Sequence, residues 1–142
     1  MAIAEYGKIL DKNTSSTEKI FKAGLKFKEE KLLDRAMMEF IKAIALQSDY
    51  PEAYIELADV YKKKNLHDTA ILVCKQLLTV KQNYSPAQYT IASVYALKND
   101  SKNSIKWLTW ALTQEPDYIN KIEKDTDFNS IKKSKEFRKL LK

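Results

Sequence analysis

When the sequence is aligned with itself at a shift of 34 residues, many positions carry similar residues and no gap is needed. Three blocks follow one another in this register, at 17–50, 51–84 and 85–118. Small, aromatic and aliphatic residues return at the same places in each block. The recurring sets are Gly24, Ala58, Ala92; Phe27, Tyr61, Tyr95; Ala36, Ala70, Ser104; Phe40, Cys74, Leu108; Ala43, Leu77, Ala111; Ile44, Leu78, Leu112; and Tyr50, Tyr84, Tyr118. Such a period is typical of an array of repeated supersecondary units.

Each block contains two helical patterns. In the second block, apolar residues recur every three or four positions on both sides of a turn near Asn65, which is the spacing of two amphipathic helices. Pro51 and Pro86 suit the first turn of a helix, and Pro116 suits a position just after one. We predict helices over 18–30, 34–46, 52–64, 68–80, 86–98 and 102–114.

The composition agrees with an all-α chain. Only 2 glycines and 3 prolines occur among 142 residues, which leaves little material for turns. The small residues at positions 24, 58 and 92 would let the two helices of each block approach closely. We therefore predict one solenoid of three helix-turn-helix units with further helices at its ends.

The residues at these positions resemble the signature of the tetratricopeptide repeat family. The second block carries that signature at Tyr54, Leu57, Ala58, Tyr61, Ala70, Cys74 and Leu77. The first block departs from it at Ala23 and the third at Gln88 and Ser104, and only the third has the late proline. The resemblance covers about residues 17–118. It implies a right-handed α-α superhelix that binds other proteins.

Segments outside the repeats are expected to complete the array. In the N-terminal segment 1–16, a short helix through Ile3, Tyr6, Ile9 and Leu10 precedes a polar linker at 13–17. That helix could cap the first repeat or lie in the groove, and the sequence leaves both open. Residues 119–142 carry eight basic and four acidic residues, most of the net charge of +6. Their pattern resembles the closing element of many bacterial arrays of this family, so we expect a basic C-terminal capping segment.

The concave surface implied by the resemblance is the expected place for function. In this family the first helix of each pair lines that surface. Exposed apolar strips in a groove mark binding sites, and four outward positions that the core does not require are apolar here: Phe21, Leu25, Ile55 and Tyr89. The predicted groove residues are Phe21, Lys22, Leu25, Lys28, Ile55, Glu56, Asp59, Lys62, Tyr89, Thr90, Ser93 and Leu97.

The groove residues argue against one role of the family. Members that hold chaperone C-termini clamp a carboxylate with Lys, Asn and Arg side chains from these rows. The matching positions here are Phe21, Leu25, Glu56, Pro86 and Thr90. They include no cation, and Glu56 would repel a carboxylate. Glu56 and Asp59 predict instead a peptide or amphipathic helix that carries Lys or Arg.

Trp107 and Trp110 form a second candidate surface. They lie three residues apart in the last repeat helix and flank the core positions Leu108 and Ala111. One interpretation is that the C-terminal segment packs over at least one ring. The other is that they contact a partner, or a second copy of the chain, on the convex face.

No pattern indicates catalysis. His67 is the only histidine and lies in a predicted turn, which excludes a histidine-rich metal site. Cys74 is the only cysteine, coincides with core positions and has no histidine placed to activate it. Gly7 and Gly24 are isolated, so a glycine-rich phosphate loop is absent. We predict no enzyme activity, no metal, no cofactor and no small-molecule substrate.

The favoured function is a protein–protein interaction scaffold or adaptor that binds a peptide or helix in the groove. A secretion-type or assembly chaperone for one specific substrate is the first alternative. The second is a nucleic-acid accessory protein that uses the basic tail, although Arg138 is the only arginine there. A homo-oligomer is left open. No secretory signal or membrane-spanning run is visible, which predicts a cytoplasmic protein.

Overall fold

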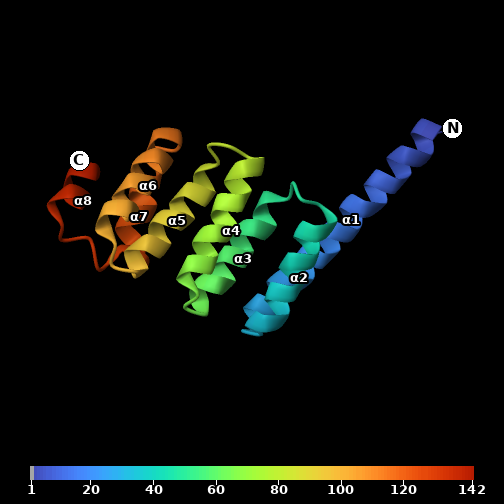
Figure 1. Ribbon diagram of the computed structural model, residues 1–142, viewed down its shortest axis with the longest axis horizontal. Helices are drawn as coiled ribbons and strands as arrows, with labels where there is room; N and C mark the ends of the chain where they lie inside the picture. Colours follow the sequence, from blue (N-terminus) through green and yellow to red (C-terminus); the bar gives the residue numbers. More distant parts are fainter. Residues whose placement is uncertain (1) are drawn as a thin grey trace.

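The computed structural model describes the backbone of residues 2–142 and the side chains of residues 16–142. Within this range the chain is helical and contains no strand, which confirms the predicted all-α class. Three antiparallel helix pairs stack side by side along the molecule (Figure 1). The pairs are α1 (Ala2–Glu29) with α2 (Leu33–Leu46), α3 (Pro51–Lys63) with α4 (His67–Val80), and α5 (Ser85–Leu97) with α6 (Ser101–Gln114).

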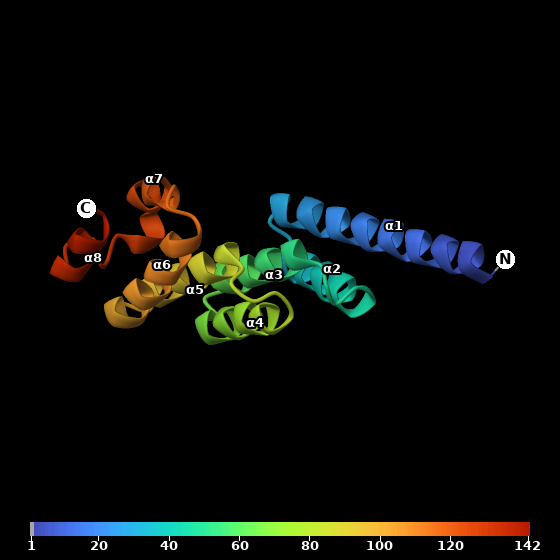
Figure 2. The same cartoon turned by 90° about the horizontal axis from the view of Figure 1, so that it is seen from above.

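The contacts between helices follow the order of the chain. Each pair packs internally and contacts the next pair through α2 with α3 and α4 with α5. The first helices of neighbouring pairs also meet, α1 with α3 and α3 with α5. In Figure 2, α1 and α7 lie at opposite ends of the row that α3 and α5 form between them. α4 lies on the other side of this row, below α3 and α5. No helix in the described range is long and apolar enough to cross a membrane.

The six predicted repeat helices are confirmed to within one residue, apart from the start of α1. That helix runs without a break from Ala2 to Glu29, so the expected linker at 13–17 is wrong. Asn, Ser and Thr are weaker helix formers than Ala, but each costs only about 0.5–0.7 kcal/mol, and no proline interrupts the segment. The predicted stripe Ile3, Tyr6, Ile9 and Leu10 lies outside the described side chains, and α1 projects beyond α2 (Figure 1).

The turn inside each repeat is formed by a residue with left-handed backbone geometry. Lys31, Asn65 and Asn99 have φ angles of 63°, 62° and 64°, and they are spaced by the 34-residue period. Asparagine tolerates this region better than other residues with a side chain, because its short amide bonds locally. Lys31 has no such advantage, so the first turn is the least favourable of the three.

The two helices of the first repeat cross at Gly24. A Cβ atom added to this glycine would lie 2.6 Å from Cε1 of Phe40, whose ring is completely buried. In the later repeats the glycine is replaced by alanine, and the phenylalanine by the smaller Cys74 and Leu108. Gly24 and Phe40 therefore form one packing unit in which the missing methyl group makes room for the ring.

Cys74 is confirmed as a core residue. Its side chain lies on α4 and is fully buried in the hydrophobic core, and burial raises the pKa of the thiol to about 12. The thiol therefore stays protonated at neutral pH, and the thiolate that a nucleophile needs does not form.

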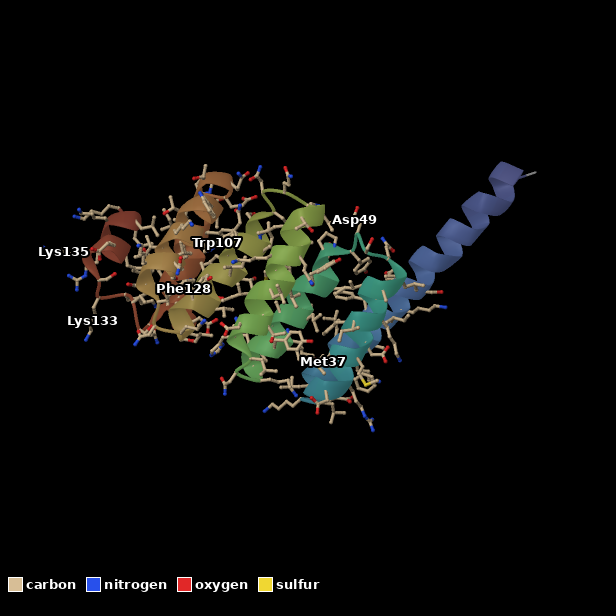
Figure 3. All side chains as sticks on the ribbon, in the orientation of Figure 1. Met37, Asp49, Trp107, Phe128, Lys133 and Lys135 are labelled. Atoms are coloured by element: carbon tan, nitrogen blue, oxygen red, sulfur yellow. The ribbon has the colours of Figure 1, made fainter. Side chains whose placement is uncertain are left out.

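The C-terminal segment folds back onto the last repeat. It comprises α7 (Tyr118–Lys124), the 3-10 turn η1 (Thr126–Phe128) and α8 (Lys135–Leu140). η1 contacts α5, while α7 and α8 contact α6. Ile122, Phe128, Ile131 and Phe137 are buried there. Figure 3 shows Phe128 within the packed end of the array, whereas Lys133 and Lys135 point outward.

We expect Gly24→Ala to destabilise the protein by about 1–2 kcal/mol. The added methyl group overpacks the core against Phe40, and this outweighs the better helix propensity of alanine. Phe40→Leu should destabilise the Gly24→Ala variant less than it destabilises the parent protein, because the two changes together recreate the Ala92–Leu108 pair of the third repeat. Urea denaturation of both single variants and the double variant measures the coupling, and purely additive effects would contradict it.

We expect Lys31→Gly to stabilise the protein by about 0.5–1 kcal/mol, because glycine adopts the left-handed conformation without steric cost. Lys75→Gly is the matched control, since Lys75 is an exposed lysine in the middle of α4. That change should destabilise by about 1 kcal/mol. Thermal melts of both variants test the sign, and a loss of stability in Lys31→Gly would show that the lysine side chain has contacts that outweigh its strain.

Candidate functional site

A polar hollow lies on the concave side of the array. Its volume is about 350 Å³, and α1, α3, α5 and the C-terminal segment line it. Most of the predicted groove residues meet there: Lys28, Ile55, Glu56, Asp59, Lys62, Tyr89, Thr90 and Ser93. Lys121, Asp125 and Asp127 complete the lining, and sequence reasoning did not predict them as groove residues.

Alternating charges connect the floor of this hollow. The Nζ atom of Lys28 lies 2.5 Å from Glu56 and 2.6 Å from Asp59, which joins the first repeat to the second. The Nζ atom of Lys62 lies 3.5 Å from Asp59 and 2.8 Å from Asp127, which joins the second repeat to the C-terminal segment. The pairs form one network across three parts of the chain.

The network keeps Lys28, Asp59 and Lys62 charged at neutral pH. Burial by itself would lower the pKa of Lys28 and raise that of Asp59, but the opposite charges around them outweigh this effect. The pKa of Lys28 is therefore raised and that of Asp59 is lowered. The pKa of Lys62 is raised in the same way, since Asp127 and Asp59 outweigh its burial. The acidic centre predicted at Glu56 and Asp59 is thus already balanced by lysines and does not by itself call for a basic ligand.

Tyr89 is not an exposed anchor of the groove, as the sequence had suggested, but is only 5% exposed. Its hydroxyl donates a hydrogen bond of 2.8 Å to Asp125. Its ring packs against Tyr118 and Phe128, and Lys121 lies over it at 4.5 Å. Burial, together with Asp125, raises the pKa of Tyr89, so the hydroxyl remains a donor. The neighbouring Ser93 is also buried, at 1% exposure.

Phe21 was likewise predicted to face the groove, and it packs against the core instead. Its ring centre lies 5.7 Å from that of Phe40 and 5.2 Å from that of Tyr50. The same geometry recurs two repeats later, where Tyr118 meets Tyr89 at 5.0 Å. The tyrosine at the end of each of these two blocks therefore packs against the first helix of its own block. The sequence prediction considered each helix separately and missed this contact.

The remaining predicted groove residues differ in their surroundings. Leu25 is half-buried beside a second hollow of about 480 Å³, whose other lining residues are Lys28, Glu29, Lys31, Glu56 and Lys63. Lys22 is exposed and pairs with Glu18 at 3.1 Å. Leu97 is 40% exposed at the end of α5.

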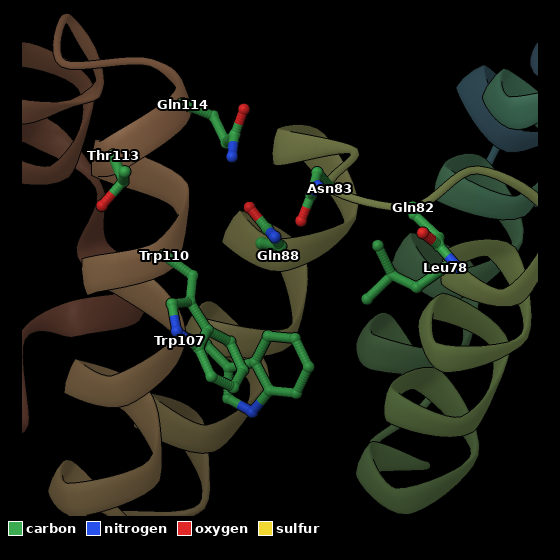
Figure 4. Close-up of a pocket in the computed structure, with 8 residues that line it drawn as sticks. All are labelled: Leu78, Gln82, Asn83, Gln88, Trp107, Trp110, Thr113 and Gln114. Carbon is green, nitrogen blue, oxygen red and sulfur yellow. The ribbon is translucent and has the colours of Figure 1, made fainter.

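The two tryptophans lie on the opposite side of the array. They face a hollow between α4 and α6 (Figure 4), and all of its lining residues come from positions 78–114. The C-terminal segment therefore does not close this hollow. The indole rings are perpendicular, with centres 4.7 Å apart, and Trp110 is 43% exposed.

The role of Asp125 and Asp127 in the groove could be predicted from the sequence only in part. Asp125 accepts the backbone N–H of Asp127 at 3.0 Å, as a residue that caps a turn does. What could not be seen is that this turn aims both carboxylates into the groove, toward Tyr89 and Lys62. That contact depends on how the C-terminal segment folds back.

Comparison with known proteins identifies the fold as that of tetratricopeptide repeats. The sequence model described as tetratricopeptide repeat matches residues 51–84. No curated protein matches the sequence. Among solved structures, MamA superposes with a TM-score of 0.72 at 20% identity, covering 99% of this chain and 80% of that one. The first TPR of Spaghetti (RPAP3), bound to an HSP90 peptide, gives 0.69 at 15% identity over 87% and 89%. The Yersinia enterocolitica type III secretion translocator chaperone SycD gives 0.71 at 12% over 83% and 92%.

We expect Asp59→Asn to destabilise the protein by about 1–2 kcal/mol at neutral pH, between the values for exposed and buried ion pairs. Because the pKa of Asp59 is lowered by folding, its contribution is present above the unfolded value of about 4 and is lost as the pH falls through the folded value. The difference in stability between the variant and the parent should therefore shrink below about pH 4. Glu18→Gln, at an exposed pair, is the control and should change little; a gap independent of pH at Asp59 would contradict the network.

Proposed function

We propose that this tetratricopeptide-repeat protein is an interaction scaffold that binds a segment of another protein on the concave side of its first two repeats. The fold is that of a protein-interaction module, and it supports a binding role rather than a catalytic one. The placement of the C-terminal segment supports this location of the binding surface. The segment fills the groove beside the third repeat, where Asp125 bonds to Tyr89, and it leaves the surface around Leu25 and Ile55 uncovered.

The uncovered surface suits an apolar anchor with polar neighbours. Leu25 and Ile55 are half-buried, so their exposed parts offer apolar area without being needed in full by the core. The rim carries both signs of charge, including Glu29 and Lys31 beside Leu25. A ligand helix or extended peptide with one apolar side chain and mixed polar flanks matches this arrangement.

The ligand does not need to be strongly basic. Glu56 and Asp59 already contact Lys28, and Asp59 also has Lys62 and Lys63 within 3.5 Å. A basic residue of the ligand would compete with lysines that are held in place by the fold, so charge alone gives it little advantage. We therefore assign recognition to the apolar contact at Leu25.

We expect Leu25→Glu to abolish capture of the partner. The change removes the apolar anchor and places a carboxylate where the apolar side chain of the ligand would pack, and burying that charge against an apolar group is unfavourable although lysines also line this hollow. Affinity capture from a lysate of the source cells, read by quantitative mass spectrometry, should enrich a protein with the parent chain that Leu25→Glu fails to retain. Tyr89→Ala is unsuitable for this test, because Tyr89 is buried and its loss would disturb the C-terminal segment.

The matched control is Leu72→Glu, which adds the same charge at a 56% exposed leucine on α4. This variant should capture the partner as the parent does. Circular dichroism must show equal helicity for both variants. Equal capture by the parent and Leu25→Glu would place the binding surface elsewhere.

A further inference from the structure

The hollow between α4 and α6 on the convex side has no role in the concave site. Its volume is about 350 Å³, and it is lined by Leu78, Gln82, Asn83, Gln88, Trp107, Trp110, Thr113 and Gln114 (Figure 4). None of these described side chains is ionisable. The lining combines two indole rings with four carboxamide groups, each of which can both donate and accept a hydrogen bond. Such a surface selects an uncharged ligand that has an apolar body and polar groups.

The 34-residue register explains why the hollow extends to the loop between α4 and α5. Gln88 occupies the position that Tyr54 occupies in the second repeat. The Tyr54 ring is 5% exposed, and its hydroxyl donates a hydrogen bond of 2.8 Å to the carbonyl of Ser48. The residue equivalent to Ser48 in the next repeat is Gln82, which lines the hollow. The third repeat therefore lacks a tyrosine ring at the place where the second repeat has one.

A corresponding hollow between α2 and α4 shows that the two places are equivalent. It is lined in part by Ile44, Tyr54, Val73 and Gln76. Their counterparts one period later are Leu78, Gln88, Trp107 and Trp110, which line the hollow between α4 and α6. Only the hollow with the shorter Gln88 reaches the loop residues Gln82 and Asn83. The extra space is the space that a tyrosine side chain would take.

Gln88 itself lacks a hydrogen-bond partner. The residue is 6% exposed, and its Oε1 atom is buried and accepts no hydrogen bond from any described residue. A buried acceptor without a donor is unfavourable, so a ligand that brings an O–H or N–H group gains a bond that the free protein lacks. This second observation points to a ligand independently of the missing ring.

We propose that this hollow binds a tyrosine side chain presented by an uncharged segment of a partner protein. The ring takes the place that Tyr54 fills in the preceding repeat, against Leu78 and Trp107. Its hydroxyl donates to the carbonyl of Gln82 or to Oε1 of Gln88. The backbone of the inserted segment meets the carboxamides at the rim, such as that of Gln114.

The surroundings favour a neutral aromatic side chain over a charged one. Lys106 already lies over the Trp110 ring at 5.2 Å, so a cationic side chain would meet a like charge. The perpendicular indoles present one face and one edge, which suits an edge-to-face contact with a third ring. Trp110 is 43% exposed, and exposed tryptophans next to a pocket are frequent centres of binding energy.

Probe binding to the full chain tests the proposal directly. Trp107 and Trp110 are the only tryptophans, so their fluorescence and indole N–H signals in NMR report on the hollow alone. N-acetyltyrosinamide should shift these signals with saturation. N-acetylphenylalaninamide, which lacks the hydroxyl, should bind about 3- to 10-fold more weakly, as expected for one hydrogen bond. An acetylated, amidated Gly-Gly-Tyr-Gly-Gly peptide should bind at least as tightly as the single residue.

Two variants test whether the probes bind in this hollow. Gln88→Tyr should fill the part of the hollow beside Gln82, as the Tyr54 side chain does beside Ser48, and abolish binding of the probes. Trp110→Ala should weaken binding at least tenfold, with Trp107 as the remaining reporter, and it covers the case in which Gln88→Tyr does not fold. Leu72→Ala removes an exposed leucine from α4 outside this hollow and should leave binding unchanged.

Three outcomes would overturn the proposal. The first is probe binding that is unaffected by Gln88→Tyr and Trp110→Ala. The second is binding of N-acetyltyrosinamide without binding of the peptide, which would indicate a small-molecule site. The third is a dimer, detected by sedimentation, that Trp110→Ala dissociates, since the hollow would then contact a second copy of this chain. None of these tests involves Leu25, so they are independent of the concave site.

Discussion

The close approach of two helices at one small residue per repeat is the contact on which the rest of the structure depends. At Gly24 the helices are so close that a single methyl group would overlap the ring of Phe40. This contact sets the angle between the helices of a pair, and the pairs can stack only because each presents the same shape to the next. The apolar surface, the turns and the groove all take their positions from this stacking.

The helices could be predicted from the sequence because their determinants are local and periodic. Small residues, aromatic residues and turn residues recur every 34 positions, and left-handed turn residues such as Asn65 and Asn99 follow the same period. The groove was harder to predict. Most of the predicted residues line one hollow, but the burial of Tyr89 and the pairing of Lys62 with Asp127 depend on a segment outside the period. The unbroken α1 was missed because weak helix formers were interpreted as a linker.

The third repeat differs from the other two on its concave side, in its interior and on its convex side. On the concave side the C-terminal segment covers it, and Ser130 donates a hydrogen bond of 2.8 Å to the carbonyl of Ala96 on α5. On the inner side Ser104 replaces an alanine and donates to the carbonyl of Ala92 at 2.7 Å, so the buried hydroxyl is satisfied. On the convex side Gln88 replaces a tyrosine, and the hollow there extends to the loop residues Gln82 and Asn83. Divergence of the third repeat from the repeat pattern thus coincides with the C-terminal segment on one side and the hollow beside the tryptophans on the other.

The ion pair between Lys62 and Asp127 joins residues 65 positions apart, whereas the repeat helices pack mainly on their neighbours along the chain. Ribosomal synthesis proceeds from the N-terminus, so α1 to α4 emerge and can pair before Asp127 exists. During that interval Lys62 faces an open groove with only Asp59 as a counter-charge. The nascent protein therefore has a wider and more positive concave surface than the finished one. The charge balance of the groove is completed only when the C-terminal segment folds back and Asp127 reaches Lys62.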